Sequence, residues 1–489
     1  MRLIIVSNRL PISIKKTDNG FEYKESSGGL VTGLVCVKEK MEFVWVGNIG
    51  GDLKLTPDEQ KIITNDCWEK YKSIPVFIDS ELNEKAYNGF CNGILWPLLH
   101  SFPDDVNFSS VLWEAYVQYN TKMCDQLIEM AKDDDVFWVH DYHLMILPQM
   151  IRDRCNKKIK IGFFLHVPWP SSEIFDVLPV RKEIVLGIMN SDLVSFHLYD
   201  YLSHFANTCE KLFPRVEDYQ PIQAKSLWGN DLKDSLELIF YGVGEVDIGT
   251  RKVMFAATPI GIEPKLFRTS LAKESLKLRV QELKSQFKNK KIILGVDRVD
   301  YIKGIPNRIK AFECFLDKYP QFVDKVVFFQ IGVPSRLNVT EYESLVSVIN
   351  RMVGTLNSKY GGVDETFFYF LNKSVDFDEL CGLYSIADAC IITSIRDGMN
   401  LVALEYIACQ EEKKGCLILS EFAGAQTTLP GAISINPWNI GGTADAIYEA
   451  LTMDEVSRKE RFEVNNQNIE VFTAVKWAED NIELLSKNI

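Results

Sequence analysis

Short apolar runs that alternate with helical patterns constrain the fold of this chain more than any other feature. In the first half these runs cover residues 3–8, 43–48, 74–78, 136–141, 161–167 and 192–196. In the second half they cover residues 252–262, 291–300, 325–332, 365–371, 389–394, 416–420 and 432–437. Strands this apolar are typical of parallel sheets that are buried on both faces. The alternation therefore predicts the α/β class, with two successive doubly wound domains.

The length of the chain indicates more than one domain, and its net charge limits the classes of partner. The chain has 489 residues, more than one hydrophobic core usually serves. A polar stretch at residues 215–250 interrupts the alternation, so we expect an N-terminal domain over 1–245 and a C-terminal domain over 246–467. The net charge of -13 argues against nucleic acid or an anionic membrane as a partner.

Cysteine usage indicates the compartment. The 11 cysteines are scattered singly, with no C-x-x-C pair and no zinc-ligand spacing, as expected of a protein in the reduced cytoplasm. The first apolar run is too short for a secretory signal, and no run approaches the roughly 18 residues of a membrane span. We therefore expect a cytoplasmic protein.

Basic residues and glycines follow the first predicted strand. Arg9 comes directly after it, and Gly28 and Gly29 open a helical pattern where backbone N–H groups can approach an anion. A plain turn explains the two glycines as well, and Arg9 alone could be a surface arginine.

A second basic pair lies between a strand and a helix. Arg298 and Lys303 combine a planar fork with a point charge near a helix start, which suits a diphosphate. The alternative is that Arg298 pairs with Asp297 or Asp300. Arg336 follows another strand and could join the same site.

Histidines cluster after two strands of the first half. His140, Asp141 and His143 suggest a metal, but consecutive positions alternate sides and no further ligands accompany them. We interpret Asp141 as an acceptor for a hydroxyl-rich substrate, with helix capping as the alternative. His166 is held by a proline-rich turn, and it is either a positioned functional group or a satisfied core residue.

Acidic residues occur in three further settings. The D-x-D patterns at 132–136 and 375–380 are explained by solvated charge and helix capping rather than by a metal-bound nucleotide. The third setting is a strand-to-helix turn that carries Arg396 and Asp397, with Glu405 on the apolar helix beyond it. Charges this close to a core element point to a ligand site at the strand end.

Many segments resemble the trehalose-6-phosphate synthases, which are retaining glycosyltransferases. They are SNRLP, SSGGLVTGL, YNGFCNGILWPLLH, WVHDYHL, GFFLHVPWPSSEIF, PIGIEP, DRVDYIKGIP, SRLNVTEY, RDGMNLVALEYIACQ and SEFAGA, in the family's order. The resemblance implies a GT-B architecture: two Rossmann-like domains face each other across a cleft, and a C-terminal helix, here 468–489, crosses back to the first. It implies an enzyme of trehalose biosynthesis that transfers glucose from UDP-glucose to glucose 6-phosphate. The products are α,α-trehalose 6-phosphate and UDP.

The resemblance also assigns acceptor contacts. Arg9 and Arg336 would hold the 6-phosphate with help from the Tyr87 hydroxyl. Trp96 would shape the acceptor pocket, and Asp141 would accept hydrogen bonds from sugar hydroxyls.

For the donor, Arg298 and Lys303 match the diphosphate pair, while His166 and Asp397 match contacts to the transferred glucose. These four residues would carry catalysis through a front-face displacement, with no metal and no cofactor. The remaining donor contacts are Gly28 and Gly29 at the phosphates, Val375 at the uracil, the backbone of Gly398, Met399, Asn400, Leu401 and Val402, and Glu405 at the ribose.

The chain departs from the family at two places. Leu337 and Asn338 follow Arg336 where the family usually has glycine and aspartate, a change that we expect to affect phosphate binding. The stretch 215–250 is longer than the usual connection. No phosphatase motif follows, so dephosphorylation is expected to need a separate phosphatase.

Two alternatives to an active synthase remain. A non-catalytic regulatory subunit of a trehalose-synthesising complex would have lost donor residues, whereas Arg298, Lys303, Asp397 and Glu405 are present. A related GT-B synthase with another sugar acceptor is disfavoured by the acceptor set. The chain could also form a homo-oligomer.

Overall fold

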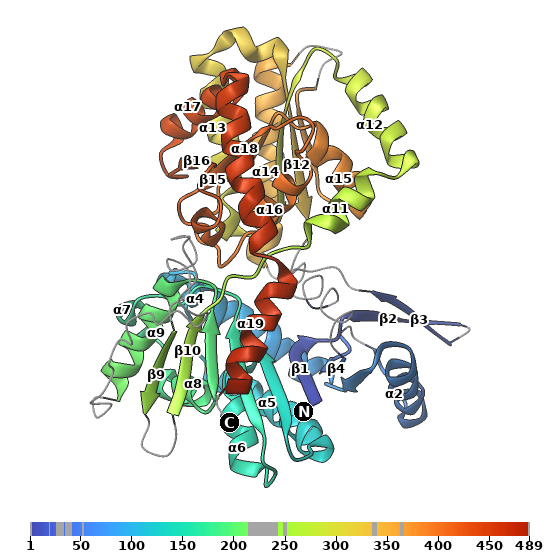
Figure 1. Ribbon diagram of the computed structural model, residues 1–489, viewed down its shortest axis with the longest axis vertical. Coiled ribbons are helices and arrows are strands. Elements are labelled where there is room, and N and C mark those ends of the chain that lie inside the picture. Colours follow the sequence, from blue (N-terminus) through green and yellow to red (C-terminus); the bar gives the residue numbers. More distant parts are fainter. Residues whose placement is uncertain are drawn as a thin grey trace. The chain divides into compact units, whose positions relative to one another are not determined.

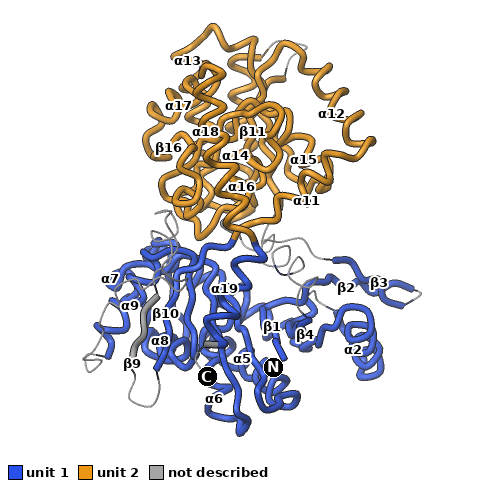
Figure 2. The backbone as a smooth tube through the Cα atoms, viewed as in Figure 1, with its two compact units in different colours: residues 1–260, 474–489 blue, residues 261–473 orange. Residues whose placement is uncertain are grey.

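The structure is a computed structural model of residues 1–489 and describes residues 2–18, 20–25, 34, 42–50, 53–213, 243–247, 252–334, 340–361 and 366–487. The chain divides into two compact units: unit 1 contains residues 1–260 and 474–489, and unit 2 contains residues 261–473 (Figure 2). These boundaries differ from the predicted ones at 245/246 and 467/468. Each unit is an α/β assembly around its own sheet (Figure 1).

Among the described residues, the sheet of unit 1 has eight strands, all parallel except β9, which pairs antiparallel with β10. In spatial order they are β5 (Ser73–Val76), β4 (Phe43–Asn48), β1 (Arg2–Arg9), β6 (Asp135–His140), β7 (Lys160–Leu165), β8 (Leu193–Phe196), β10 (Lys252–Ala257) and β9 (Val243–Asp247). The chain runs outward from β1 to β4 and β5, then returns to β6 on the other side of β1. The strand order thus reverses between β1 and β6, and their carboxyl ends form the switch point where doubly wound sheets bind ligands.

The described residues of unit 1 also form a hairpin and several helices. The hairpin is β2 (Ile12–Thr17) with β3 (Gly20–Glu25). The helices are α2 (Pro57–Tyr71), α3 (Ser80–Asn83), the π-helix η1 (Glu84–Leu95), α4 (Trp96–Leu99), η2 (Pro103–Asp105), α5 (Ser110–Met130), η3 (Tyr142–Leu144), α6 (Leu147–Arg154), α7 (Ser172–Phe175), α8 (Arg181–Met189), α9 (Tyr199–Leu212) and α19 (Ala474–Lys487).

The C-terminal helix α19 packs on strands β7 and β8 of unit 1 (Figure 1). Gly162 on β7 permits this approach, because a Cβ there would lie 2.8 Å from Leu485 Cδ1. Lys160 Nζ donates to the Leu485 carbonyl at 2.7 Å, which satisfies one of the last carbonyls of the helix. Asn481 Nδ2 donates to Thr258 Oγ1 at 3.0 Å. These contacts fix α19 on the first sheet.

In the part of unit 2 that the structure describes, the sheet has six parallel strands. Their order is β13 (Phe368–Leu371), β12 (Val326–Val333), β11 (Lys291–Arg298), β14 (Ala389–Ile392), β15 (Cys416–Ser420) and β16 (Ile433–Ile435). Side chains alternate along β11: Ile292 and Leu294 enter one hydrophobic core and Ile293 enters the other. The order reverses between β11 and β14, which sets the second switch point.

The helices of unit 2 cover both faces of this sheet. They are α11 (Pro264–Leu271), α12 (Glu274–Gln286), η4 (Tyr301–Lys303), α13 (Ile305–Lys318), η5 (Pro320–Lys325), α14 (Thr340–Tyr360), α15 (Phe377–Ile386), α16 (Leu401–Ala408), η6 (Gly424–Thr427), α17 (Ile440–Thr452) and α18 (Glu455–Val471).

Two segments differ from the sequence-based prediction. The run at 252–262 was expected to start the second domain, but its strand β10 pairs with β8 in the first sheet. Periodicity predicts that a run is a strand, whereas the neighbour with which it pairs is decided by tertiary contacts. The single helix expected from residue 468 onward is divided between two helices, since α18 ends at Val471 and α19 begins at Ala474.

Candidate active site

At the switch point of unit 1, three of the predicted acceptor residues come together. Arg9 ends β1, and its guanidinium carbon lies 5.0 Å from the centre of the Tyr87 ring. Tyr87 stacks on His143, with ring centres 5.4 Å apart. Asp141, directly after β6, places Oδ2 3.9 Å from His143 Nδ1. A cation, a phenol, an imidazole and a carboxylate therefore line one edge of the sheet, which suits a ligand with a phosphate and several hydroxyls.

Asp141 adopts a backbone conformation that non-glycine residues rarely use. Its φ is 76°, in a region that costs of order 1–3 kcal/mol and that is concentrated at functional sites. The side chain makes no capping hydrogen bond to the following helix η3. Its Oδ1 instead accepts from the backbone N–H of His166 at 3.3 Å. The capping alternative is therefore wrong for Asp141.

Trp96 lies at the junction between the π-helix η1 and helix α4. The ring is 5% exposed, and its centre is 4.2 Å from that of His100 and 5.7 Å from that of Tyr142, the neighbour of Asp141. π-Helices are rare in proteins, and those that occur often lie at functional sites. The π-helix η1 therefore indicates that this segment belongs to a functional site. The role of Trp96 in shaping the acceptor pocket stays a prediction.

His166 follows β7 in unit 1. Its Nε2 lies 3.1 Å from Nδ1 of His140, which is fully buried at the end of β6. Burial lowers the pKa of His166 well below its ordinary value, and the neighbouring His140 and His197 lower it further. His166 is thus a neutral imidazole at physiological pH.

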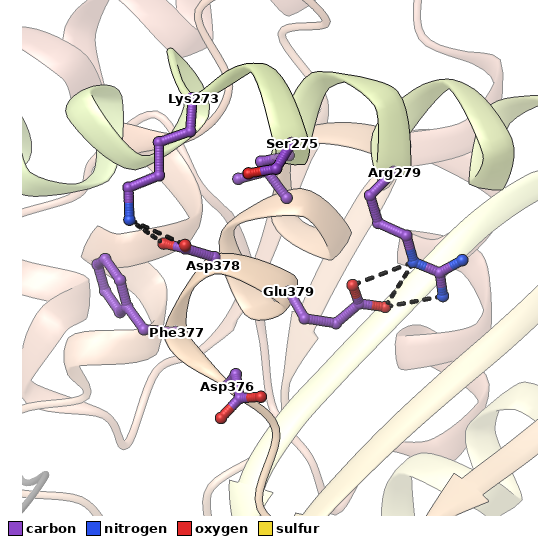
Figure 3. A pocket seen from close by; sticks show the side chains of 8 residues that line it. Lys273, Ser275, Arg279, Asp376, Phe377, Asp378 and Glu379 are labelled. Atoms are coloured by element: carbon purple, nitrogen blue, oxygen red, sulfur yellow. Dashed lines mark hydrogen bonds and ion pairs between the residues drawn. The ribbon is translucent and has the colours of Figure 1, made fainter.

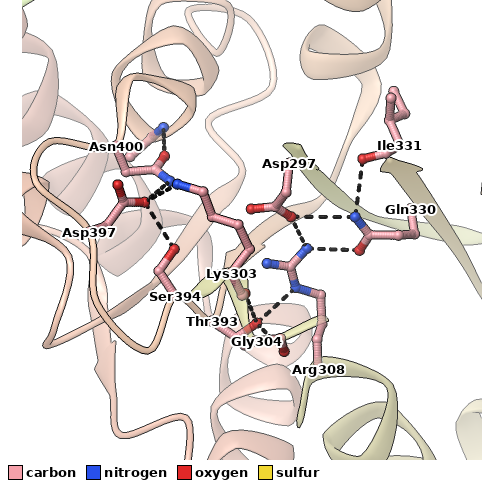
Figure 4. A network of polar contacts seen from close by, with 11 residues as sticks. Asp297, Lys303, Gly304, Arg308, Gln330, Ile331, Thr393, Ser394, Asp397 and Asn400 are labelled. Atoms are coloured by element: carbon pink, nitrogen blue, oxygen red, sulfur yellow. Dashed lines mark hydrogen bonds and ion pairs between the residues drawn. The ribbon is translucent and has the colours of Figure 1, made fainter. Parts of the chain in front are cut away.

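At the switch point of unit 2, Lys303 and Asp397 form an ion pair with Nζ 2.6 Å from Oδ2 (Figure 4). Lys303 comes from η4 after β11, and Asp397 from the loop after β14, so the pair bridges the point where the strand order reverses. Ser394 Oγ and Asn400 Nδ2 also donate to Asp397 Oδ2, at 3.1 and 3.0 Å. The contacts fix the direction of both charged side chains.

A buried network holds the Lys303 loop from behind (Figure 4). Arg308 is fully buried and forms an ion pair with Asp297. Its Nε donates to Thr393 Oγ1 at 3.1 Å, and the Thr393 hydroxyl lies 3.2 Å from the carbonyl oxygen of Lys303 and 3.0 Å from that of Gly304. The loop after β11 is therefore tied to the end of β14.

The sequence leaves open whether Arg298 pairs with Asp297 or Asp300, and the contacts of the two aspartates bear on this question. Arg298 is exposed at the end of β11. Asp297 points into the core toward Arg308, and Asp300 accepts from the Ile302 N–H and the Tyr342 hydroxyl, both at 3.3 Å. Both aspartates thus have structural partners.

The helix α16 begins beside Asp397. Asn400 is its N-cap, and the Asn400 side chain accepts from Ala403 N at 3.2 Å. Such a helix start offers backbone N–H groups to an anion. Gly398 is buried, while the predicted contacts Val375, Met399, Leu401 and Val402 are partly buried and pack against one core of unit 2.

Glu405 is one turn into α16. Its Oε2 accepts from the Tyr384 hydroxyl at 2.9 Å. Burial raises the pKa of the Glu405 carboxyl, and the hydrogen bond from Tyr384 offsets part of this effect. The group is therefore held in one orientation at a cost in stability.

Three predicted site residues, Gly28, Gly29 and Arg336, lie outside the described residues, as do Leu337 and Asn338. Most of the stretch 215–250 also lies outside them, apart from β9. The roles assigned to these positions stay predictions.

The histidines and aspartates considered for a metal do not converge. His140 contacts His166, whereas the His143 ring stacks on Tyr87. Asp135, in the first D-x-D pattern, is not solvated as predicted, because it is buried and paired with Arg2 at 2.6 Å. In the part of the chain that the structure describes, no group of three or more His, Cys, Asp or Glu is arranged to hold a metal.

The second D-x-D pattern lines a groove of about 600 Å³ between α12 and α15 (Figure 3). There Asp378 pairs with Lys273 at 2.8 Å and Glu379 with Arg279 at 3.0 Å. The charges compensate one another, and Asp376 is the N-cap of α15 without a side-chain capping hydrogen bond.

Comparison with known proteins decides the family. The sequence profile of glycosyltransferase family 20 matches residues 1–487. The chain belongs to glycosyltransferase family 20. The resemblance drawn from the motifs is thereby confirmed.

Named relatives and solved structures align with this chain over nearly its full length. The alpha,alpha-trehalose-phosphate synthase [UDP-forming] of Encephalitozoon cuniculi is 48% identical over 483 residues, which cover 99% of this chain and 97% of the relative. An E. coli structure named trehalose-6-phosphate bound with UDP-2-fluoro glucose matches with a TM-score of 0.85 and 30% identity over 100% of both chains. An alpha,alpha-trehalose-phosphate synthase (UDP-forming) from Burkholderia xenovorans in complex with glucose-6-phosphate matches with a TM-score of 0.84 and 28% identity, covering 99% of this chain and 100% of that one. The predicted GT-B fold class is confirmed.

Sequence reasoning missed several supporting residues of this family 20 chain. Tyr384, Thr393 and His140 contact Glu405, the Lys303 loop and His166, respectively. Tyr384 and Thr393 lie far in sequence from the residues that they contact, and His140 was considered only as a metal ligand. Arg396, left without a role, lies over the Phe422 ring with its guanidinium carbon 4.7 Å from the ring centre.

Thr393→Val is expected to loosen the loop that carries Lys303. The change keeps the side-chain shape but removes the acceptor of the buried Arg308 Nε, at a cost of about 1–3 kcal/mol. We expect a lower free energy of unfolding, measured by urea denaturation. Thr355→Val is the control, since its hydroxyl donates to its own helix at an exposed site. Equal effects in both variants would contradict this role.

Glu405→Gln is expected to stabilise the protein at neutral pH. A carboxyl whose pKa is raised in the folded state loses stability as the pH rises above its ordinary value near 4.3, because the folded state then has to hold the charge. Glutamine cannot ionise and still accepts from Tyr384. The Tm of the variant should exceed that of the wild type at pH 8, and the difference should shrink toward pH 5. Exposed Glu343 on α14 supplies the control Glu343→Gln, which removes a carboxylate at the surface and should leave the Tm close to that of the wild type.

Proposed function

We propose that this chain transfers glucose from UDP-glucose to the anomeric hydroxyl of glucose 6-phosphate, with retention, giving α,α-trehalose 6-phosphate and UDP. The observation that carries the proposal is the Lys303–Asp397 pair beside the start of α16, at the switch point of unit 2. It supplies a cation and backbone N–H groups for a diphosphate, together with a carboxylate for sugar hydroxyls. The names of the relatives that align over nearly the full length of the chain point to the same reaction.

On the donor side, the bond that breaks joins the anomeric carbon of glucose to a phosphate oxygen of UDP. Negative charge develops on that oxygen, and we assign its stabilisation to Arg298, Lys303 and the N–H groups at the start of α16. Asp397 and His166 contact the transferred glucose. Glu405 holds the ribose, Val375 contacts the uracil, and Gly28 and Gly29 approach the phosphates.

On the acceptor side, Arg9 and Arg336 bind the 6-phosphate, assisted by the Tyr87 hydroxyl. Trp96 shapes the pocket and Asp141 accepts from hydroxyls of the acceptor. The new bond joins the anomeric oxygen of glucose 6-phosphate to the anomeric carbon of the donor. The proton of that hydroxyl passes to the departing phosphate oxygen, so UDP leaves from the same face.

The product assay tests the proposal. Purified protein is incubated with UDP-glucose and glucose 6-phosphate, UDP release is followed, and the sugar product is analysed by NMR. We expect one non-reducing sugar phosphate per UDP. Folded protein that yields no product would overturn the proposal, and nucleotide binding without turnover would favour the regulatory-subunit alternative. GDP-glucose as donor and fructose 6-phosphate as acceptor test specificity in parallel.

We further propose a cytoplasmic enzyme whose product is dephosphorylated by a separate phosphatase. The ten cysteines in the described residues are all free thiols, as suits a reducing compartment. Within those residues, no helix combines the length and apolar character needed to cross a membrane. Fractionation of cells that express the tagged chain tests the location.

A further inference from the structure

His140 has a contact that its place in the core does not require. It ends β6, it is fully buried, and its Nδ1 lies 3.1 Å from His166 Nε2. The register of β6 and β7 pairs His140 with Phe164, two residues before His166. The sheet itself therefore brings the two imidazoles together.

Aromatic rings surround the rest of the His140 side chain. Its ring centre lies 4.6 Å from that of Trp138, 6.1 Å from that of Trp477 on α19 and 6.4 Å from that of Phe164. Among the described residues, His140 Nε2 has no hydrogen-bond partner. His166 is thus the hydrogen-bonding neighbour of His140, and the C-terminal helix helps to enclose the pair.

The hydrogen bond between the two rings needs one N–H donor, which belongs either to His140 or to His166. Burial lowers the pKa of His140 to about 3, and His166 is also neutral. Each neutral ring carries a single N–H, on one nitrogen or the other. Buried N–H groups without an acceptor are rarer than under-satisfied acceptors. The proton of His140 is therefore placed on Nδ1, the nitrogen that has a partner.

We propose that His140 is a positioning residue: it donates from Nδ1 to His166 Nε2 and fixes His166 as the Nδ1–H tautomer. His166 then presents an N–H donor, not a lone pair, to a hydroxyl oxygen of the transferred sugar. This inference rests on the proposed function, which places the transferred sugar at His166. A hydrogen bond made by the other nitrogen commonly sets which nitrogen of a functional histidine carries the proton.

The tautomer can be observed directly. The chain has 6 histidines, so ¹⁵N-histidine labelling with long-range ¹H–¹⁵N spectra resolves the imidazoles, and single substitutions assign them. We expect His166 to be protonated on Nδ1 and unprotonated on Nε2 in the wild-type protein. A proton on His166 Nε2 would overturn the proposal. This readout does not need turnover, so it stands apart from any failure of the proposed function.

Two matched variants test the consequence for catalysis. His140→Asn and His140→Leu have nearly the same shape, but only asparagine keeps an N–H donor near the position of Nδ1. We expect His140→Leu to lower kcat by roughly tenfold to a hundredfold with little change in KM, the range seen when the hydrogen-bond partner of a metal-bound histidine is removed. His140→Asn should stay within several-fold of the wild type. Equal kcat values in the two folded variants would overturn the proposal, and if His140→Leu does not fold, the wild-type tautomer decides.

Discussion

Arg298→Ala is expected to lower kcat by roughly 10²- to 10³-fold, the usual cost of removing one donor that stabilises charge developing in a transition state. Arg298 ends β11 at the switch point of unit 2, one short turn before Lys303. Since the diphosphate gains charge as the glycosidic bond breaks, the loss should fall on kcat more than on KM for UDP-glucose. Steady-state kinetics at saturating glucose 6-phosphate measure both constants.

The control for Arg298 is an exposed arginine elsewhere in the same unit. Arg351→Ala on α14 removes the same charge away from the switch point and should leave both constants unchanged. A drop in kcat of the same size in both variants would mean that net charge, not leaving-group stabilisation, is responsible. A change confined to KM would remove Arg298 from the catalytic set.

Arg9→Ala is expected to raise KM for glucose 6-phosphate by roughly 10- to 100-fold, with a smaller change in kcat. Hydrogen bonds to charged groups contribute about 1.5–3 kcal/mol, and Arg9 is assigned to the 6-phosphate. The side chain is exposed at the end of β1, so the free energy of unfolding should change little. Initial rates over a range of glucose 6-phosphate at saturating UDP-glucose provide the measurement.

Arg9→Lys is the companion variant to Arg9→Ala. Lysine keeps the charge but loses the planar fork, so affinity for the acceptor should recover only in part. Full recovery would indicate a point-charge contact. If Arg9→Ala and Arg298→Ala lowered kcat by the same factor and raised KM by the same factor, the division of roles between the two arginines would be contradicted.

Much of the fold follows from local pattern. The runs at 43–48 and 416–420 are β4 and β15 with the predicted bounds, and residues 305–318 form α13 as expected. These segments are apolar enough to be buried wherever they pair, so their conformation is set by their own residues. Boundaries near 245 and 468 were less accurate, since they depend on which sheet receives β10 and on the break between α18 and α19.

Candidate site residues were accessible to sequence reasoning because parallel strands bring their carboxyl ends to one edge. Arg9 ends β1 beside Tyr87, and Asp141 follows β6 beside His143. Lys303 and Asp397 follow β11 and β14 and form an ion pair. The contacts that hold the site residues and their loops in place could not be predicted from the sequence. Tyr384 reaches Glu405 and Arg308 reaches Asp297 through side-chain directions that no spacing rule predicts.

The sequence by itself determined the α/β class, the positions of most strands, the family and the residues that carry charge to the strand ends. Only the tertiary structure decided that β10 joins the first sheet, that Gly162 is the point where α19 approaches it, and that His140 lies against His166. The physical reason is that hydrophobic periodicity reports burial, which is a local property. Strand order, register and hydrogen-bond partners depend on contacts between residues far apart in the chain.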